Sequence, residues 1–390
     1  MKKGWTYKKL GEVCEKSKNI NWNNITAGEQ YIYIDLSSVD RDSLSITDPQ
    51  IIDKTNAPSR AKQIVKNGDV IFATTRPTLR RLCLIPLSFD SQICSTGFCV
   101  LRPKKDIDPR WIYYTLQGDK FYQYIEPLQT GASYPAVTDG IVKEYSILIP
   151  PLSEQKRIVS RLDSAFAHID ALKANAEKQL SDAKALFQKA LEKAMEPKEG
   201  WEEKKIGDLF KTYAGGTPLK SGENYYEGGT IPWIRSGEVC QKYINACELY
   251  ITEDGMKNSS AKYYPVNTIL VAMYGATAAQ VGILKFEATS NQAVCGILPR
   301  KDFIPEYIYY WFVNIQKELA SQAQGGAQPN LSQVKIKKVL LSYPPLSEQQ
   351  AIVSRLDQLS EKVKRLQKIQ EKTIKECDAL KQAMLRQVFE

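Results

Sequence analysis

Two stretches of the chain nearly repeat each other: PPLSEQKRIVSRLD at residues 150–163 and PPLSEQQAIVSRLD at residues 344–357. Each stretch leads into a long run without Gly or Pro, which extends to Glu196 in the first copy and to Glu390 in the second. Gly and Pro cost roughly 1 and 3 kcal/mol inside a helix. Their absence, in a chain with 22 Gly and 19 Pro, predicts two long helices over residues 152–196 and 346–390.

The start of each helix carries capping chemistry. We expect Ser153 and Ser347 to be N-caps, because a serine hydroxyl can accept a hydrogen bond from an unpaired backbone N–H of the first turn. The glutamate that follows each serine places negative charge at the positive end of the helix dipole.

Hydrophobic residues recur along both helices at mainly three-and-four spacing, which is typical of a helix that packs against a partner helix. At about 1.5 Å per residue each helix would be roughly 65 Å long, and few domains are broad enough to cover such a length. A surface helix on each domain is the alternative, but we predict that the two helices form a coiled coil with each other. The residues predicted for this packing are Ile158, Leu162, Ile169, Leu172, Leu186, Ile352, Leu356, Leu359, Val363, Leu366 and Leu380.

Composition limits the class of protein. A chain of 390 residues with 43% hydrophobic residues is long enough for two or three domains with their own cores. No run approaches the ~20 apolar residues of a membrane span, and the opening MKKGWTYKKL lacks the apolar segment of a signal peptide. The eight cysteines form no C-x-x-C pair, so neither a zinc site nor a redox motif is predicted. We expect a cytoplasmic protein with reduced cysteines and no membrane partner.

The net charge is +9, and residues 1–151 and 197–345 carry +6 of it. This excess is mild and is typical of folded domains with a basic patch rather than of a charged arm.

An internal repeat organises the chain. WTYKKLGE at residues 5–12 returns as WEEKKIGD at 201–208, and IDPRWIYYTL at 107–116 returns as FIPEYIYYWF at 303–312. We therefore predict a domain at 1–151, a spacer helix at 152–196, a second domain at 197–345 and a second spacer helix at 346–390. Between these anchors the two copies diverge, and loops on a shared scaffold are where recognition usually lies.

The predicted fold class is α+β, with two mixed α/β domains joined by two long antiparallel helices. Parallel helices would require the second domain to span roughly 65 Å back to the start of its neighbour, whereas antiparallel helices would not. Antiparallel packing would place the domains at opposite ends of the helix pair, related by an approximate two-fold axis. Helices are expected after Pro109 and Pro305, and strands at residues 31–36, 70–74, 98–101, 146–149, 231–235, 268–272, 294–298 and 339–342.

Catalytic motifs are missing from the sequence. The single histidine, His168, lies in the first long helix without a nucleophile nearby, and we expect it to be an exposed helix residue. No P-loop occurs, and the strings IPPL and YPPL lack the polar first residue and aromatic last residue of an adenine methyltransferase motif. We read the pair Gly215-Gly216 as a turn. No catalytic residue and no metal ligand is predicted.

The chain resembles the DNA-specificity subunit of type I restriction-modification systems over essentially its whole length. The resemblance is carried by the two PPLSEQ…IV…RLD helix starts and by three phrases. These are QTGASYPAVTDGIVKEYSILIPPLSEQ at 129–155, GGTPLKSGENYYEGGTIPWIRSGEV at 215–239 and GGAQPNLSQVKIKKVLLSYPPLSEQ at 325–349.

This resemblance implies two target-recognition domains, each reading one half of a bipartite, asymmetric site in double-stranded DNA. The spacer helices would set the gap between the halves and dock two modification (methyltransferase) subunits. The chain would carry no cofactor, because S-adenosylmethionine is expected on the modification subunits and ATP on the restriction subunits.

Loop residues of both domains are candidates for DNA contact, because arginine and amide side chains can meet base edges or phosphates. The candidates are Arg60, Lys62, Arg76, Thr78, Arg80, Arg81, Ser133 and Tyr134 in the first domain, and Lys220, Ser221, Asn224, Tyr225, Arg235, Tyr274, Thr277, Gln280, Gln328 and Asn330 in the second.

Two other hypotheses remain open. A coiled-coil assembly adaptor without DNA sequence specificity would use the same helices and ignore DNA. A nuclease would need a carboxylate cluster that the sequence does not reveal.

Overall fold

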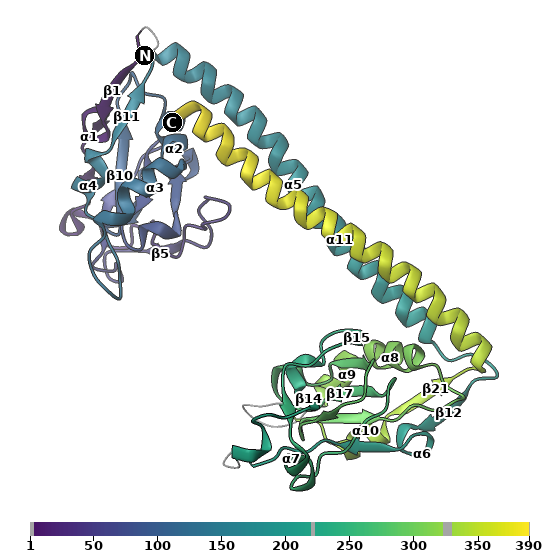
Figure 1. The fold of residues 1–390 in the computed structure, drawn as a ribbon. Coiled ribbons are helices and arrows are strands. Elements are labelled where there is room, and N and C mark those ends of the chain that lie inside the picture. The colour runs from purple at the N-terminus through teal and green to yellow at the C-terminus, as the bar shows by residue number, and fades with distance from the viewer. Residues whose placement is uncertain (1–3, 220–222, 323–329, 390) are drawn as a thin grey trace. The chain divides into compact units, whose positions relative to one another are not determined.

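The structure is a computed structural model that describes residues 4–219, 223–322 and 330–389. The chain divides into two compact units, one formed by Met1–Glu177 with Glu371–Glu390 and the other by Lys178–Gln370. Each unit contains one mixed α/β domain and a segment of each long helix (Figure 1). The predicted α+β class is therefore confirmed.

Two sheets and one strand pair build the first domain. A four-stranded antiparallel sheet has the order β2-β10-β7-β8, and a five-stranded sheet has the order β3-β6-β9-β4-β5 with β4 and β9 parallel. The third group is the antiparallel pair β1-β11. The strands are β1 (Thr6–Lys9), β2 (Cys14–Glu15), β3 (Lys18–Asn19), β4 (Tyr31–Ile34), β5 (Gln50–Ile52), β6 (Ala61–Ile64), β7 (Val70–Ala73), β8 (Leu82–Leu84), β9 (Ile93–Ser95), β10 (Phe98–Pro103) and β11 (Ser146–Ile149). The helices are α1 (Leu10–Val13), α2 (Pro109–Thr115), α3 (Asp119–Ile125) and α4 (Asp139–Glu144).

The second domain also consists of two sheets and one strand pair. Its sheets have the orders β13-β20-β17-β18-β15 and β16-β14-β19, with the pair β12-β21 beside them. The strands are β12 (Glu202–Lys205), β13 (Thr212–Ala214), β14 (Ile231–Ile234), β15 (Tyr243–Ile244), β16 (Tyr250–Ile251), β17 (Ile269–Ala272), β18 (Val281–Leu284), β19 (Thr289–Ser290), β20 (Val294–Ile297) and β21 (Leu340–Tyr343). The helices are α6 (Ile206–Leu209), α7 (Glu253–Lys257), α8 (Pro305–Asn314), α9 (Gln316–Ser321) and α10 (Gln333–Lys338). All eight predicted strands are present in the two domains.

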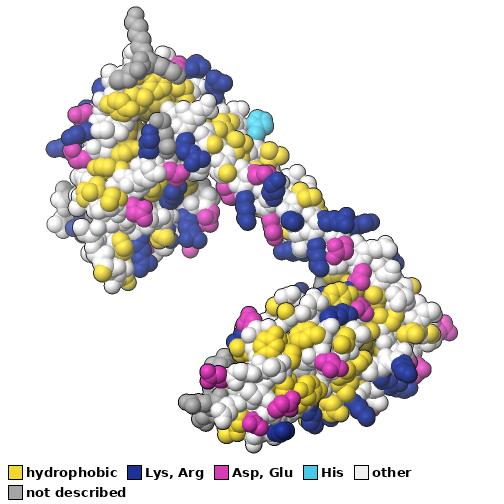
Figure 2. Space-filling view, in the orientation of Figure 1, with side chains coloured by type: hydrophobic (Ala, Val, Ile, Leu, Met, Phe, Trp, Pro, Cys, Tyr) yellow, Lys and Arg dark blue, Asp and Glu magenta, His cyan; other side chains and the backbone are white. Residues whose placement is uncertain are grey.

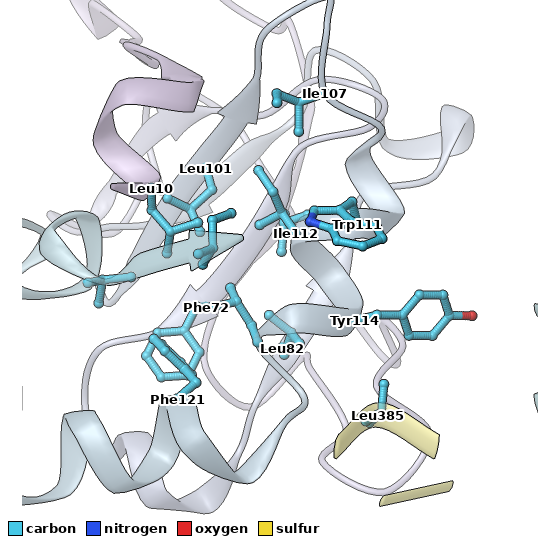
Figure 3. Packing of buried hydrophobic residues seen from close by; sticks show 14 of the residues in the cluster. Leu10, Phe72, Leu82, Leu101, Ile107, Trp111, Ile112, Tyr114, Phe121 and Leu385 are labelled. Carbon is cyan, nitrogen blue, oxygen red and sulfur yellow. The ribbon is translucent and has the colours of Figure 1, made fainter. Parts of the chain in front are cut away.

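Hydrophobic clusters lie on opposite faces of the sheet that contains β7 in the first domain and of the sheet that contains β17 in the second. They do so because successive side chains of a strand point to opposite faces. In the first domain Phe72 of β7 meets Phe121 of α3 edge to face, with ring centres 5.0 Å apart (Figure 3). The neighbouring Ile71 and Ala73 lie in the other cluster. The aromatic residues of the repeated helix are buried or partly buried in the clusters that include α2 and α8: Trp111, Tyr113 and Tyr114 in α2, and Tyr307, Tyr309, Tyr310 and Trp311 in α8.

The two long helices are α5 (Leu152–Met195) and α11 (Leu346–Phe389), each of 44 residues. Both begin one residue before the predicted serine cap. The carbonyl of Pro151 accepts hydrogen bonds from the N–H groups of Glu154 and Gln155 at 2.9 and 3.0 Å. The prediction that Ser153 is the N-cap is therefore wrong, because the proline before the helix already occupies that position; Pro345 does the same for α11.

The helices are antiparallel within each unit, as predicted. In the first unit Lys173 binds Asp378 at 2.8 Å while Lys381 binds Asp170, so numbers rise along α5 as they fall along α11. In the second unit the C-terminal end of α5, with Leu191, shares a hydrophobic cluster with Leu356 near the start of α11.

The seam between the helices differs in part from the predicted one. Leu162, Ile169, Ile352 and Leu356 are buried, and Ile158, Leu359, Val363 and Leu366 are half-buried. The side chains of Leu172, Leu186 and Leu380, however, are 57%, 59% and 51% exposed. In α5, Ala176 and Ala183 are buried and Phe187 is half-buried, so the inward face lies one residue beyond the predicted Leu186.

Within the described ranges, no helix is both long and apolar enough to cross a membrane.

Candidate nucleic-acid interface

The glutamine of each PPLSEQ stretch ties the domain to the long helix. The side chain of Gln155 is fully buried; its Oε1 accepts the N–H of Asp108 at 2.9 Å and its Nε2 donates to the carbonyl of Pro150 at 2.8 Å. Gln349 makes the same pair of bonds with Ile304 and Pro344, both at 3.0 Å. Each glutamine therefore fixes the start of the domain helix, α2 or α8, against the start of the long helix.

The aspartate that ends each repeated stretch provides a second attachment. Asp163 accepts hydrogen bonds from the hydroxyl of Tyr114 and from the guanidinium of Arg110, both at 2.5 Å. Burial, and then the hydrogen bond to Asp163, raise the pKa of the Tyr114 hydroxyl above its ordinary value. The carboxylate thus joins α2 to α5.

The second copy builds the same attachment with a different cation. Asp357 accepts hydrogen bonds from the hydroxyl of Tyr310 and from the ammonium of Lys242. Lys242 precedes β15, whereas the cation of the first copy comes from α2 itself. The contact is therefore retained although the residue that supplies the charge has moved.

In each domain, the loop that follows β7 or β17 is hydrogen-bonded to a second loop. Thr75 follows β7 and forms an isolated antiparallel bridge with Ala136, and Tyr274 follows β17 and forms one with Asn330. The neighbouring backbone bonds are also equivalent: Val137 donates to Thr74 at 2.9 Å, and Leu331 donates to Met273 at 2.7 Å. The turn after the strand and the loop before α4 or α10 thus form one surface in each domain, which we call the loop pair.

The turn of each loop pair has two residues with left-handed backbone. They are Arg76 and Arg80, with φ of 49° and 57°, and Gly275 and Ala279, with φ of 70° and 67°. Residues other than Gly rarely adopt this backbone conformation. The turn shape is therefore common to both domains, whereas the side chains that it presents are not.

In the first domain the loop pair brings together six predicted residues. The guanidinium of Arg76 lies over the ring of Tyr134, 4.8 Å from its centre, and Tyr134 is 69% exposed. Arg80 stacks on Tyr122 at 4.2 Å and forms an ion pair with Asp119 at 2.9 Å. The predicted residues of this surface are Arg76, Thr78, Arg80, Arg81, Ser133 and Tyr134.

Arg60 lies at the edge of this surface. The carbonyl of Arg60 accepts the N–H of Thr96 at 2.9 Å. The carbonyl of Gly97, the residue after Thr96, accepts the N–H of Thr74 at 2.9 Å. The turn at Ser95–Gly97 thus links Arg60 to the end of β7. Lys62 is exposed on β6.

The second domain places its predicted residues in two groups. Tyr274, Thr277, Gln280 and Asn330 belong to the loop pair. Asn224 and Tyr225 lie elsewhere, where their carbonyls accept bonds from the hydroxyl and the N–H of Thr252 at 2.6 and 3.0 Å. Arg235 is also apart and pairs with Glu238 and Glu248, so its charge is balanced within the domain. Lys220, Ser221 and Gln328 lie outside the described residues.

The prediction that Gly215 and Gly216 form a turn is wrong, because neither residue lies in a turn and close packing explains both. A Cβ on Gly215 would lie 2.2 Å from the carbonyl oxygen of Asn291, and one on Gly216 would lie 2.1 Å from the nitrogen of Ala261. Only glycine fits at these two positions, where segments distant in sequence meet.

Charge alone does not mark the interface. Figure 2 shows Lys and Arg side chains interspersed with Asp and Glu side chains over the visible face of each unit. His168 is exposed, as predicted. In the described part of the chain, no group of three His, Cys, Asp or Glu side chains could hold a metal ion. All eight cysteines are free thiols, and burial raises the pKa of Cys14, Cys83 and Cys295 to about 12.

Sequence reasoning missed the roles of Gln155, Gln349 and Lys242. The glutamines carried a usable signal, because both copies of the stretch retain them beside residues that change. Lys242 carried none, since its counterpart in the first copy comes from another element.

Comparison with known proteins gives a consistent match to both halves. Residues 2–181 and 198–375 each match the type I restriction modification DNA specificity domain. The specificity subunit of the type I restriction enzyme EcoR124I/EcoR124II from Escherichia coli is 30% identical over 212 residues, which cover 53% of this chain and 52% of that subunit. The chain therefore spans about half the length of that relative.

Two solved structures resemble the whole chain. The HsdS subunit from Thermoanaerobacter tengcongensis is 27% identical, with a TM-score of 0.64 over 100% of this chain and 97% of that one. A chain from a study of complex assembly and conformational transition of the type I R-M system is 28% identical, with a TM-score of 0.85 over 98% of this chain and 97% of that one.

Proposed function

The chain belongs to the family of type I restriction-modification DNA specificity proteins, and we propose that it selects the DNA target of such a system. Each domain reads one half of a bipartite, asymmetric site in double-stranded DNA. One observation carries this proposal: the attachment of domain to helix is repeated by Tyr114–Asp163 and Tyr310–Asp357, whereas the loop pairs carry different side chains on the same backbone turn. Equal scaffolds with unequal loops suit two readers of two different half-sites.

The loop pairs are the surfaces that we propose for DNA contact. In the first domain Arg76 and Tyr134 offer a charged and an aromatic group to the duplex, and Ser133 and Thr78 offer hydroxyl groups. Arg60 and Lys62 flank them and would contact phosphates, which position a protein without reading sequence. In the second domain Tyr274, Thr277, Gln280 and Asn330 fill the same place.

Several candidates have weaker support in the second domain. Arg235 already pairs with Glu238 and Glu248, so DNA contact would require it to leave at least one of them. Asn224 and Tyr225 sit outside the loop pair. We propose these three, with Lys220, Ser221 and Gln328, as flanking contacts only.

We further propose that α5 and α11 set the gap between the half-sites and dock two modification subunits. A helix of 44 residues has a length of about 65 Å and is a rigid element that can fix a spacing. Exposed Leu172, Leu186 and Leu380 give the helices apolar groups that their own seam does not use.

The chemistry would belong to the partners. Methyl transfer to an adenine in each half-site requires that the base leaves the duplex stack, and we assign this step to the modification subunits with S-adenosylmethionine. ATP would be used by restriction subunits. The complex would act on DNA in the cytoplasm.

A binding competition tests the proposal. The full chain with its modification subunits should bind a preferred duplex and resist competition by a duplex of scrambled sequence. Its affinity should also fall steeply as salt rises, because phosphate contacts release counterions. Equal competition by all duplexes would support the assembly adaptor instead, and metal-dependent cleavage by the chain alone would support a nuclease.

A further inference from the structure

The residue after the left-handed turn is polar in both domains: Arg81 in the first and Gln280 in the second. Its backbone is held in the same way in each. The N–H of Ala73 donates to the carbonyl of Arg81 at 2.9 Å, and the N–H of Ala272 donates to that of Gln280 at 2.8 Å. Arg81 and Gln280 therefore occupy equivalent positions, at the end of the strand pairs β7-β8 and β17-β18.

The side chains of Arg81 and Gln280 also lie on equivalent faces of their sheets. The next residues, Leu82 and Val281, belong to the clusters that face α2 and α8. Because side chains alternate along a strand, Arg81 and Gln280 point to the opposite face of the sheet, away from those helices. Both are partly exposed.

Each side chain has a polar atom without a partner. The Nε of Arg81 and the Oε1 of Gln280 are buried and form no hydrogen bond with any described residue. Four side-chain atoms have this property in the part of the chain that the structure describes, and two of them lie at this one pair of positions. A buried polar atom without a partner is destabilising and calls for an explanation. Its recurrence at equivalent positions indicates a group that is kept available for a ligand.

The neighbouring arginines are engaged differently. Arg80 is held by Asp119 and by the ring of Tyr122, and Arg76 stacks on Tyr134. These contacts hold the guanidinium groups in place from within the domain. Arg81 has no such contact among the described residues.

The side-chain chemistry at this position differs between the domains in a way that matches two bases. The guanidinium fork of arginine pairs with O6 and N7 of guanine, and the amide of glutamine pairs with N6 and N7 of adenine. We propose that Arg81 and Gln280 are the matched base-reading residues of the two domains, with Arg81 selecting a guanine in one half-site and Gln280 an adenine in the other. This inference rests on the proposed function, because it assumes that both domains bind DNA.

Exchange of the two side chains tests it. Arg81→Gln and Gln280→Arg would each be made in the full chain, combined with the modification subunits, and used to select duplexes from a randomised library. Arg81→Gln should replace guanine by adenine at one position of one half-site, and Gln280→Arg should replace adenine by guanine at one position of the other. Each exchange should change the preference between the two bases by about 5- to 150-fold and leave the remaining positions unaltered.

Arg41→Gln is the matched control, since it removes an exposed guanidinium of the same domain that lies outside the loop pair and pairs with Asp42. It should leave the selected bases unchanged. The inference is overturned if folded Arg81→Gln and Gln280→Arg chains select the wild-type bases, or if they lose affinity equally for all duplexes, as loss of a phosphate contact would cause. A wild-type chain without any preferred sequence would overturn the proposed function itself, so the two failures are distinguishable. Gln280→Arg decides the matter if Arg81→Gln does not fold.

Discussion

The hydroxyl of Tyr114 donates a 2.5 Å hydrogen bond to Oδ1 of Asp163 and so joins the helix that follows the sheet of the first domain to the long helix α5. Tyr310 and Asp357 repeat this contact in the second domain. The proposed reading of DNA requires each domain to be held at a fixed angle to its long helix. Two attachments per domain, the buried glutamine and this tyrosine–aspartate pair, provide that rigidity.

Removal of the Tyr114 hydroxyl should weaken the attachment. A hydrogen bond to a charged group is worth about 1.5 to 3 kcal/mol, so we expect Tyr114→Phe to lower the free energy of unfolding by roughly 1 to 2 kcal/mol, because Asp163 keeps its bond to Arg110. Urea denaturation of the full chain measures this change. Tyr113→Phe removes a neighbouring hydroxyl that does not contact Asp163 and should cost less; an equal loss in both variants would count against the attachment.

The two adjacent glutamines at the start of α11 offer a matched comparison. Gln349 is buried and binds Ile304 and Pro344, whereas Gln350 is exposed. Gln349→Ala leaves a backbone N–H and a carbonyl unpaired, which should cost about 1 to 3 kcal/mol for each buried group left unsatisfied. Gln350→Ala should change stability by less than about 0.5 kcal/mol. Similar urea midpoints for the two variants would contradict the role assigned to the repeated glutamine.

Two carboxylates of the first domain should affect stability with opposite signs as pH changes. Burial raises the pKa of Asp139 in the folded chain, so the folded state binds its proton more tightly and this residue's contribution to stability falls as pH rises above about 4. Burial acts against Asp35 too, but hydrogen bonds from Ser37 and Ser38 outweigh it and lower its pKa. Asp35 therefore adds stability that is lost as pH falls below about 4 through its folded pKa.

The variants Asp139→Asn and Asp35→Asn should differ in their urea midpoints at neutral pH. The urea midpoint of Asp139→Asn minus that of wild type should be larger at pH 7 than at pH 4. Asp35→Asn should unfold earlier than wild type at pH 7, and that deficit should shrink on acidification. Deficits of the same sign and pH dependence in both variants would show that the assigned environments are wrong.

The length of α5 should control the gap in the DNA target. Insertion of four residues, about one helical turn, between Glu177 and Lys178 should lengthen the unspecified gap and leave the bases of both half-sites unchanged. His168→Ala alters an exposed side chain of α5 without changing helix length and should leave the gap as it is. Methylated-adenine maps of DNA from cells that produce each variant with the modification subunits measure the gap; an unaltered gap after the insertion would contradict the spacer role.

Sequence patterns were sufficient for features that depend on local spacing. The absence of Gly and Pro located both long helices, and the repeated PPLSEQ stretches and aromatic helices established the duplication. Patterns failed where two neighbouring residues were both apolar: Leu186 and Phe187 fit the seam equally well by spacing, and only packing shows that Phe187 faces inward.

Several candidate residues could be assigned to loops from the sequence, but the contacts that those residues make could not. Arg80 and Arg81 are equivalent in sequence, yet Arg80 is paired because Asp119, 39 residues away, lies beside it. Gly216 is required because a distant segment at Ala261 passes within contact distance. Such long-range neighbours have no local signature in one sequence.

Selection from a library of randomised duplexes tests the central claim most directly. The full chain would be combined with its modification subunits, and bound duplexes would be sequenced. We predict two short specified blocks of different sequence, separated by an unspecified gap of constant length. Bound duplexes without a shared sequence, or with a single uninterrupted block, would contradict the reading of one DNA site by two unlike domains.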